Sequence, residues 1–252
     1  MHPAMMQEYI RQLWAPDFHY AVQERVPWTP LTRPVSACVV ALVTCGGVHG
    51  RHDPPFAEVD DCSYRVIAGH TALDELTVTH AFYEVAETRR DLNTIFPLEH
   101  LRYLAQQGEI GAVAPRHFSF MGFIPHWQGL YAPAREVAGS LREDGVEVVI
   151  LTPGSPLCHH STALIQRILE EEGLVTVSLT LEPEITALVK PPRSLFLHFP
   201  PGCPVGEPLE PEKQLRILRE VLTELQRMEE PGSMVKTPFK WSKTCSTPQC
   251  KL

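Results

Sequence analysis

The chain has 252 residues, which is enough to bury a substantial core in one large domain or in two lobes. Its formal net charge of −8 excludes the basic surface expected of a nucleic-acid-binding protein, and no basic run suggests attachment to an anionic membrane. We therefore expect neither nucleic acid nor a membrane as a partner. The 24 prolines indicate many fixed turns and long loops.

The sequence favours a reducing compartment. No apolar run approaches the roughly 20 residues that span a bilayer. The first residues, MHPAMMQEYIRQLW, lack the charged-then-apolar pattern of a secretory signal. Seven cysteines without regular spacing do not form a disulfide framework. We expect a cytoplasmic protein whose thiols are buried or functional, with Cys245 and Cys250 open to metal or disulfide chemistry.

Hydrophobic patterning predicts alternating strands and helices along the chain. After a short helix at 6–14 and a Pro-rich lead-in, a β-branched run predicts a strand at 36–44, followed by a loop at 50–63. The next expected elements are a strand at 76–85, a helix at 98–108 and a strand at 110–115. The second half is expected to contain a helix at 132–144, a strand at 146–151, a helix at 162–172, strands at 175–181 and 195–199, and a final helix at 212–228.

Strands that alternate with helices of this length are typical of parallel βαβ units. The sequence therefore predicts an α/β fold with parallel-sheet, Rossmann- or flavodoxin-like lobes and helices on both faces. We expect a lead-in at 1–34, a first lobe at 35–130, a second lobe at 131–230 and a flexible tail at 231–252.

Two loops at expected strand ends carry reactive side chains. In open parallel sheets, ligands bind beyond the carboxyl ends of the strands. The loop TCGGVHG contains Cys45, and its Gly46 and Gly47 would let a ligand approach the backbone closely. In TPGSPLCHHS, Cys158 lies in or just before the first helical turn, where a thiolate is stabilised. Burial as an inert small residue is an equally good interpretation for Cys158 and a better one for Cys45. Substrate contacts are expected from the polar side chains of both loops, Thr44, Thr152 and Ser161.

A metal site is the alternative for the same loops. His49, Cys158 and His160 would be the ligands of a zinc ion, since zinc takes Cys and His side chains. No pair has a recognised ligand spacing, so no metal and no cofactor is the prediction. The sequence contains no GxxxxGK[ST], GxGxxG or GxSxG motif, which removes the usual support for a nucleotide-binding protein or a serine hydrolase.

Several blocks in one order carry a family resemblance. LVTCGGVH, HDPPF…DDCSYRVI, VTHAFYE, DLNTIFPLEHL, GEIGAVAPRHFSFMG and VVILTPGSPLCHHS together resemble the selenoprotein B family of the glycine/sarcosine/betaine/D-proline reductase complexes, over roughly residues 30–228. The resemblance implies a selenocysteine three residues before a cysteine, which here gives Ser155 and Cys158. A serine hydroxyl cannot act as a low-potential selenolate, so the resemblance implies a selenium-free relative.

From this we expect a thiol-dependent oxidoreductase that acts on a small polar, amino-acid-like molecule through Cys158, with Cys45 as a second thiol. His159 or His160 would lower the pKa of Cys158 or relay a proton. Arg65 and Arg116 are candidates for holding a substrate carboxylate. The expected partners are a thiol-reducing protein or another reductase subunit, and a homo-oligomer is an open alternative.

Two other functions remain open. Cys45 and Cys158 would be acid and base on opposite faces of an α-carbon in a racemase or epimerase. The chain would otherwise be a non-catalytic metal- or ligand-binding subunit of a reductase complex. Sulfurs that share a cleft would favour a two-thiol mechanism, whereas full burial of either sulfur in the core would remove it.

Overall fold

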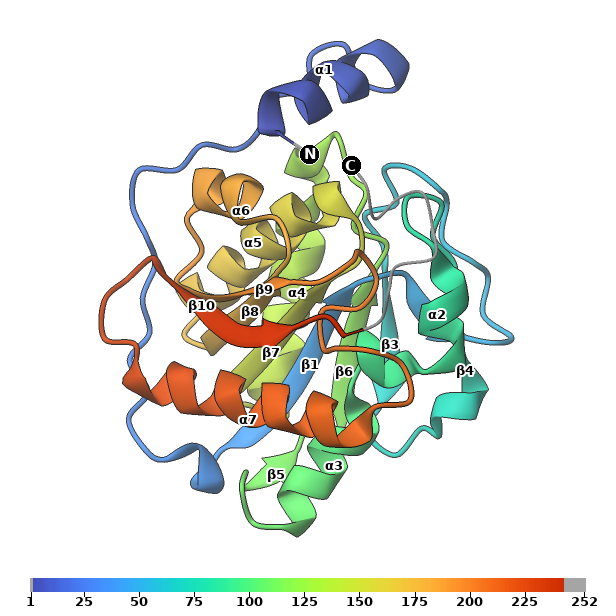
Figure 1. The fold of residues 1–252 in the computed structure, drawn as a ribbon. Helices are drawn as coiled ribbons and strands as arrows, with labels where there is room; N and C mark the ends of the chain where they lie inside the picture. Colours follow the sequence, from blue (N-terminus) through green and yellow to red (C-terminus); the bar gives the residue numbers. More distant parts are fainter. Residues whose placement is uncertain (1, 243–252) are drawn as a thin grey trace.

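A single mixed sheet of eight strands runs through the protein, whose computed structural model describes residues 2–242 (Figure 1). The spatial order of its strands is β10-β9-β8-β7-β1-β6-β3, with β5 pairing to β1. Every pair is parallel except β3 with β6. The strands are β1 (Val39–Cys45), β3 (Tyr64–Ala68), β5 (Ala112–Val113), β6 (Arg116–Phe120), β7 (Val148–Pro153), β8 (Val175–Thr180), β9 (Arg193–His198) and β10 (Ser233–Lys240). A separate antiparallel pair joins β2 (Val48–Gly50) to β4 (Leu76–Val78).

Helices cover both faces of the large sheet. The helices are α1 (Pro3–Leu13), α2 (Val85–Arg90), α3 (Leu98–Gln106), α4 (Tyr131–Glu143), α5 (Pro156–Glu171), α6 (Pro183–Val189) and α7 (Pro211–Arg227). On one face, α3 and α7 pack against the side of β1 that carries Val40 and Leu42. On the other face, α4 and α5 pack against the side that carries Ala41, Val43 and Cys45. This alternation follows from the two-residue period of a strand, and burial of both faces explains the continuous apolar runs. The predicted α/β class, with a mostly parallel sheet, is confirmed.

Strands from both expected lobes contribute to this one sheet. β1 pairs with β7 over six residue pairs, so segment 35–130 and segment 131–230 are joined by a continuous hydrogen-bonded ladder. The segment expected as a flexible tail begins instead with β10, which extends the sheet next to β9. Cys245 and Cys250 lie outside the described residues. In residues 2–242, no helix combines the length and the apolar character needed to cross a membrane.

Several element boundaries differ from those predicted. The strand expected at 76–85 ends at Val78, because the next residues form a turn in which the Phe82 N–H donates to His80 Nδ1 (3.0 Å). β3 and β6 were not predicted, since residues 64–68 and 116–120 carry no continuous apolar run and no element was expected there. The helix expected at 162–172 begins six residues earlier, at Pro156. That early start places Cys158 within the helix.

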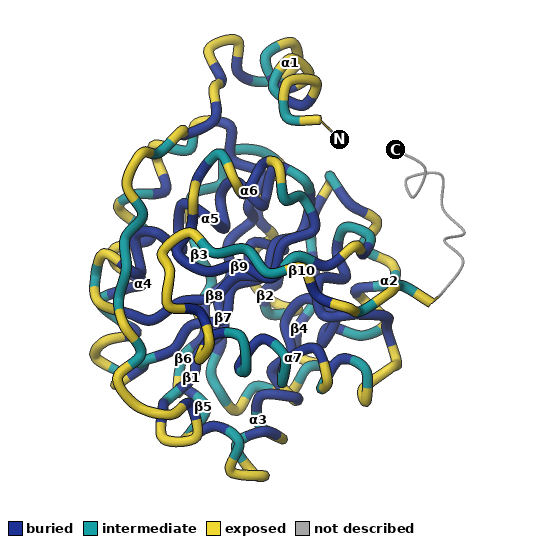
Figure 2. The backbone as a smooth tube through the Cα atoms, turned by 60° about the vertical axis from the view of Figure 1, so that its left-hand side comes forward, coloured by how far each residue is buried: buried dark blue, intermediate teal, exposed yellow. Residues whose placement is uncertain are grey.

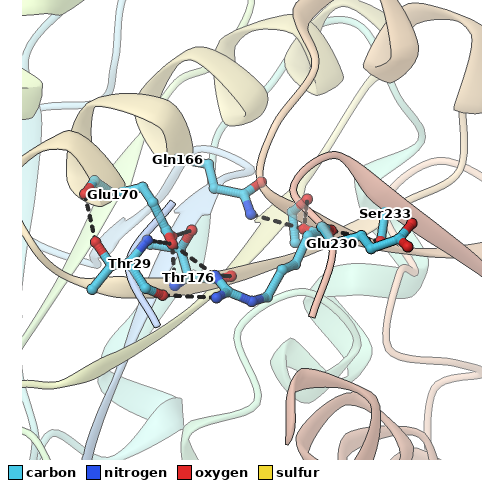
Figure 3. A network of polar contacts seen from close by, with 8 residues as sticks. Thr29, Gln166, Glu170, Thr176, Glu230 and Ser233 are labelled. Carbon is cyan, nitrogen blue, oxygen red and sulfur yellow. Dashed lines mark hydrogen bonds and ion pairs between the residues drawn. The ribbon is translucent and has the colours of Figure 1, made fainter. Parts of the chain in front are cut away.

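The N-terminal arm is tied to the core by a buried charged network (Figure 3). The carboxylate of Glu170 accepts hydrogen bonds from the Thr29 N–H (2.7 Å) and from Arg193 Nη1 (2.7 Å), and both charged side chains are almost fully buried. The guanidinium of Arg193 also lies 3.5 Å from the ring centroid of Trp28, in a cation–π contact. α1 lies well before this anchor and sits at the carboxyl edge of the sheet (Figures 1 and 2).

Candidate active site

Cys158 lies in the first turn of α5, directly beyond the carboxyl end of β7. Ser155 has an extended backbone (φ −100°, ψ 173°) and occupies the N-cap, and Pro156 follows at the first helical position. Proline is well accommodated there because its missing N–H has no partner in a first turn. The resulting geometry brings Ser155 Oγ to 3.0 Å from Cys158 Sγ. The two positions that the resemblance singled out are therefore in direct contact.

His80 is the second polar neighbour of this sulfur. Its Nε2 lies 3.2 Å from Cys158 Sγ, and its Nδ1 accepts the hydrogen bond from Phe82 N–H. Because Nδ1 is an acceptor, the neutral imidazole carries its proton on Nε2, facing the sulfur. A thiolate at Cys158 would thus receive a hydrogen bond from His80.

Burial sets the resting ionisation of the pair. Cys158 is fully buried, and this burial raises its pKa to about 11, against hydrogen bonds from the Ser155 side chain and from the backbone at Ser155, Gly154 and Cys158. Burial also lowers the pKa of His80 to about 3, against a hydrogen bond to the backbone of Met121. The resting pair is therefore a neutral thiol beside a neutral imidazole.

A cavity of about 110 Å³ reaches His80 from the surface, and Cys158 lies behind His80 and is not part of its lining. Phe56, Thr79, His80 and Met121 form its walls, and Arg89 lies at its exposed rim. Arg89 donates from Nε (3.1 Å) and Nη2 (2.8 Å) to the carbonyl of Val78, which holds the guanidinium at the rim. The cavity is far smaller than the several hundred Å³ typical of drug-sized ligands, so it suits a molecule of a few heavy atoms. Its only cationic side chain is Arg89, with Glu58 as the acidic one.

Cys45 and Cys158 both pack closely against Gly122. A Cβ placed on Gly122 would be 2.7 Å from Cys158 Sγ and 2.8 Å from Cys45 Cβ. Cys45 is also fully buried, which raises its pKa well above that of a free thiol. Both thiols are therefore buried in the core, and neither lines the cavity. Both two-thiol mechanisms therefore lose their structural basis.

His159 and His160 have structural roles and face away from the sulfur. His159 Nδ1 lies 2.9 Å from Ser155 O, and its Nε2 accepts from the Leu181 N–H (2.9 Å), so both ring nitrogens are occupied by backbone groups. His160 Nε2 accepts from the Ala21 N–H (2.9 Å), and its ring packs between aromatic side chains of the N-terminal arm and Trp127. His80 takes the position that the sequence assigned to His159.

The expected substrate-binding residues of the two loops contact protein groups. Thr152 Oγ1 lies 2.9 Å from Thr44 Oγ1 and 2.5 Å from Ile95 O, and Ser161 Oγ donates to Gly122 O (2.7 Å). Both glycines of TCGGVHG pack against protein. A Cβ built on Gly46 would lie 2.2 Å from Ile95 Cδ1, and a Cβ built on Gly47 would lie 2.3 Å from Thr79 O. These residues shape the walls around Cys158, and the structure gives them no open face toward the cavity.

Neither predicted arginine lines the cavity. Arg116 begins β6, at the opposite end of the sheet from Cys158, and its guanidinium forms an ion pair with Asp144 (2.8 Å). Arg65 donates to Pro54 O (3.0 Å) and to Ser63 Oγ (2.9 Å), and it stacks 4.2 Å from the centroid of Phe56. Arg65 thus supports the cavity wall from behind.

The alternative zinc ligands do not converge. His49 Nδ1 lies 2.7 Å from Gly50 O and its Nε2 lies 2.9 Å from Thr79 Oγ1, while His160 faces the N-terminal arm. Within residues 2–242, no group of three or more His, Cys, Asp or Glu side chains is placed to hold a metal ion. The five cysteines described are all free thiols.

Sequence reasoning missed His80 and Arg89. Both lie in or just after the segment that was predicted as one strand, which would have pointed successive side chains to opposite faces. A larger hollow of about 470 Å³ lies elsewhere, between the N-terminal arm, Trp127 and Leu188, and none of the predicted site residues lines it.

Comparison with known proteins places this chain in a family. The profile of the glycine/sarcosine/betaine reductase selenoprotein B family matches residues 5–154, which ends one residue before Ser155. The D-proline reductase subunit gamma of Acetoanaerobium sticklandii is 34% identical over 215 residues, which cover 85% of this chain and 89% of that subunit. No solved structure matches the chain.

Longer relatives match over part of their length. The glycine reductase complex component B subunit gamma of Symbiobacterium thermophilum is 27% identical over 82% of this chain and 50% of its own. The sarcosine reductase complex component B subunit beta of Peptoclostridium acidaminophilum is 27% identical over 82% of this chain and 48% of its own. The chain thus spans about half of these relatives but most of the D-proline reductase subunit. By the profile match and the 34% identity, the chain belongs to the glycine/sarcosine/betaine reductase selenoprotein B family.

Proposed function

We propose that the chain is a selenium-free, thiol-dependent reductase subunit in which Cys158 reacts and His80 assists it. The observation that carries this proposal is the position of Cys158 Sγ between Ser155 Oγ (3.0 Å) and His80 Nε2 (3.2 Å), at the start of a helix. The N–H groups and dipole of a helix start stabilise a thiolate. The relatives named as subunits of amino-acid reductase complexes support a reductase-related role for the chain.

The substrate in this proposal is a small amino-acid-like carboxylate. Arg89 at the cavity rim would hold the carboxylate, because a guanidinium pairs with two oxygens at once. Phe56 and Met121 would contact the apolar part, and the bond to be cleaved would lie toward His80. Arg89 replaces Arg65 and Arg116 in this role, since it is the arginine that lines the cavity.

In this proposal the electrons come from a second protein. Reductive cleavage of a C–N bond consumes two electrons and two protons, which oxidation of two thiols to a disulfide supplies. Among residues 2–242, the thiol in contact with His80 is that of Cys158, and Cys158 forms no disulfide with Cys45. We propose that a thiol of a partner subunit or thiol-reducing protein completes the disulfide. The same thiol chemistry supports a cytoplasmic location.

Turnover by the assembled complex tests the proposal. The chain would be combined with its partner subunits and a dithiol reductant, and offered D-proline, glycine, sarcosine and betaine. Cys158→Ala should abolish product formation, whereas Ser155→Ala, which keeps the thiol, should retain most of it. Full turnover by the Cys158→Ala complex would contradict a thiol mechanism.

The full burial of Cys158 favours one second candidate, a non-catalytic subunit that binds ligand for a partner. In that case Cys158→Ala and wild type would bind the carboxylate equally by calorimetry and would support equal turnover, while Arg89→Ala would lose both.

A further inference from the structure

Cys158 has no exposed surface, although the proposed reaction needs access to its sulfur. Two chain segments cover it. The first contributes His80, whose Nε2 contacts the sulfur. The second contributes Met121 and Gly122, with Met121 O at 3.8 Å from the sulfur and Gly122 packed against it. Access from the cavity therefore requires these two segments to part.

An aromatic contact holds the two segments together. Phe82 follows His80 by two residues, and Phe123 follows Met121 by two residues. Their rings stack with centroids 3.5 Å apart and an interplanar angle of 8°. The Phe82 N–H donates to His80 Nδ1 (3.0 Å), and the Phe123 N–H donates to Met121 Sδ (3.1 Å). Separation of the rings would thus move His80 and Met121 directly.

Trp14, at the end of α1, packs edge-on against both rings. Its centroid lies 5.3 Å from that of Phe82 and 5.1 Å from that of Phe123. We call Trp14, Phe82 and Phe123 the aromatic clip. Edge-to-face aromatic pairs add stability beyond their buried area, so Trp14 helps to keep the stack closed.

α1 is held more weakly than the core it covers. In the described residues, the hydrogen bonds of α1 stay within residues 2–18, and its inner contacts with the body come from Met6, Ile10 and Trp14. Its outer side carries Met5, Tyr9 and Leu13, which are 66%, 47% and 56% exposed. The chain is next anchored at His19, whose carbonyl accepts from Trp127 Nε1 (2.9 Å), and at Ala21, whose N–H donates to His160 Nε2 (2.9 Å). A helix held by apolar packing before a fixed anchor can leave by local opening without global unfolding.

We propose that the aromatic clip is a gate, and that release of Trp14 by movement of α1 opens the path to Cys158. The proposed function supplies only the reason for a gate. Opening of the gate can be measured without any substrate, as access of a reagent to the Cys158 sulfur. It explains how one site keeps its thiol buried at rest and reactive in use.

Alkylation of Cys158 by iodoacetamide in the full-length protein tests the gate, with each thiol quantified by mass spectrometry. Trp14→Ala should speed alkylation of Cys158 about tenfold, as expected when two aromatic contacts of a locally opening unit are lost. Phe82→Leu, which keeps the apolar character and the backbone N–H, should act in the same direction. Leu13→Ala removes an exposed side chain of the same helix and is the matched control. Its rate should equal that of wild type.

Cys38, buried near the start of β1, and Cys62, partly exposed, serve as internal references in the same samples. Selective acceleration at Cys158 supports the gate. An unchanged Cys158 rate in both Trp14→Ala and Phe82→Leu would refute it, and so would an equal rise at Cys38, because the effect would then be general loosening. Loss of turnover in Cys158→Ala is a separate result, so the gate and the thiol mechanism fail independently.

Discussion

His80 Nε2 and Cys158 Sγ lie 3.2 Å apart although 78 residues separate them in the chain. The contact depends on the turn after β4, which brings His80 beneath the first turn of α5. The imidazole presents its protonated nitrogen to the sulfur because Phe82 N–H occupies the other one. The pair is thus oriented before any ligand binds.

Substitution of His80 tests whether its imidazole acts on Cys158 directly or only stabilises the fold. We expect His80→Ala to lower turnover by about 10²-fold, the usual contribution of a positioned acid–base group. His159→Gln is the matched control, since His159 is equally buried but bonds only to backbone groups. That variant should lower the melting temperature while the folded fraction keeps near-normal turnover. Equal losses of turnover in the two variants would show that His80 acts only through stability.

Gly122 should be intolerant of any side chain. Its φ of +89° is unfavourable for other residues, and a Cβ would meet Cys158 Sγ and Cys45 Cβ. Gly145 also has a positive φ, of +69°, but nothing lies within 4 Å of its Cβ position. Gly145→Ala should therefore lower the free energy of unfolding only by the cost of a positive φ, about 1–2 kcal/mol. We expect Gly122→Ala to lower the free energy of unfolding, measured by urea denaturation, by clearly more. Equal costs would mean that the cysteines relax around the methyl group.

The alternation of apolar runs and amphipathic stretches was enough to predict the α/β class, since each buried strand contributes its own continuous run. It was not enough for β3 and β6, where Arg65 and His117 interrupt the apolar run that marks the other strands. The position of Cys158 was predictable because it follows a buried strand directly. His80 was not, because its role arises from a contact across 78 residues and from a turn that has no local signature.

The buried histidines should make the fold sensitive to acid. Burial lowers the pKa of His80, His117 and His160 to about 3 and that of His159 to about 4. Each is neutral in the folded state and is protonated in the unfolded state below about pH 6.5. The unfolded state then binds more protons, so the free energy of unfolding falls as pH falls, by about 1.4 kcal/mol per pH unit for each histidine.

Urea denaturation at pH 7.5, 6.5 and 5.5 would measure this dependence. Because glutamine does not titrate, His160→Gln should make the free energy of unfolding less dependent on pH below pH 6.5. The slope should fall by the share of one histidine, about 1.4 kcal/mol per pH unit. An unchanged slope in that variant would show that His160 is not neutral in the folded protein.

The Glu170–Arg193 pair offers the sharpest test of how the N-terminal arm is anchored. Arg193→Met removes the guanidinium that bonds Glu170 Oε1 (2.7 Å) and Thr29 O (2.7 Å), and it leaves a carboxylate buried without its counter-ion. Loss of one partner of a buried pair costs about 3–5 kcal/mol. The double variant Glu170→Gln/Arg193→Met removes both charges, so it should recover part of that loss. Arg219→Met is the control, since its pair with Glu109 is partly exposed and should contribute less than about 1 kcal/mol. Equal melting temperatures of the single and double variants would mean that the unpaired carboxylate is not the cause of the loss. The stacking of Arg193 on Trp28 would then be the contact that anchors the arm.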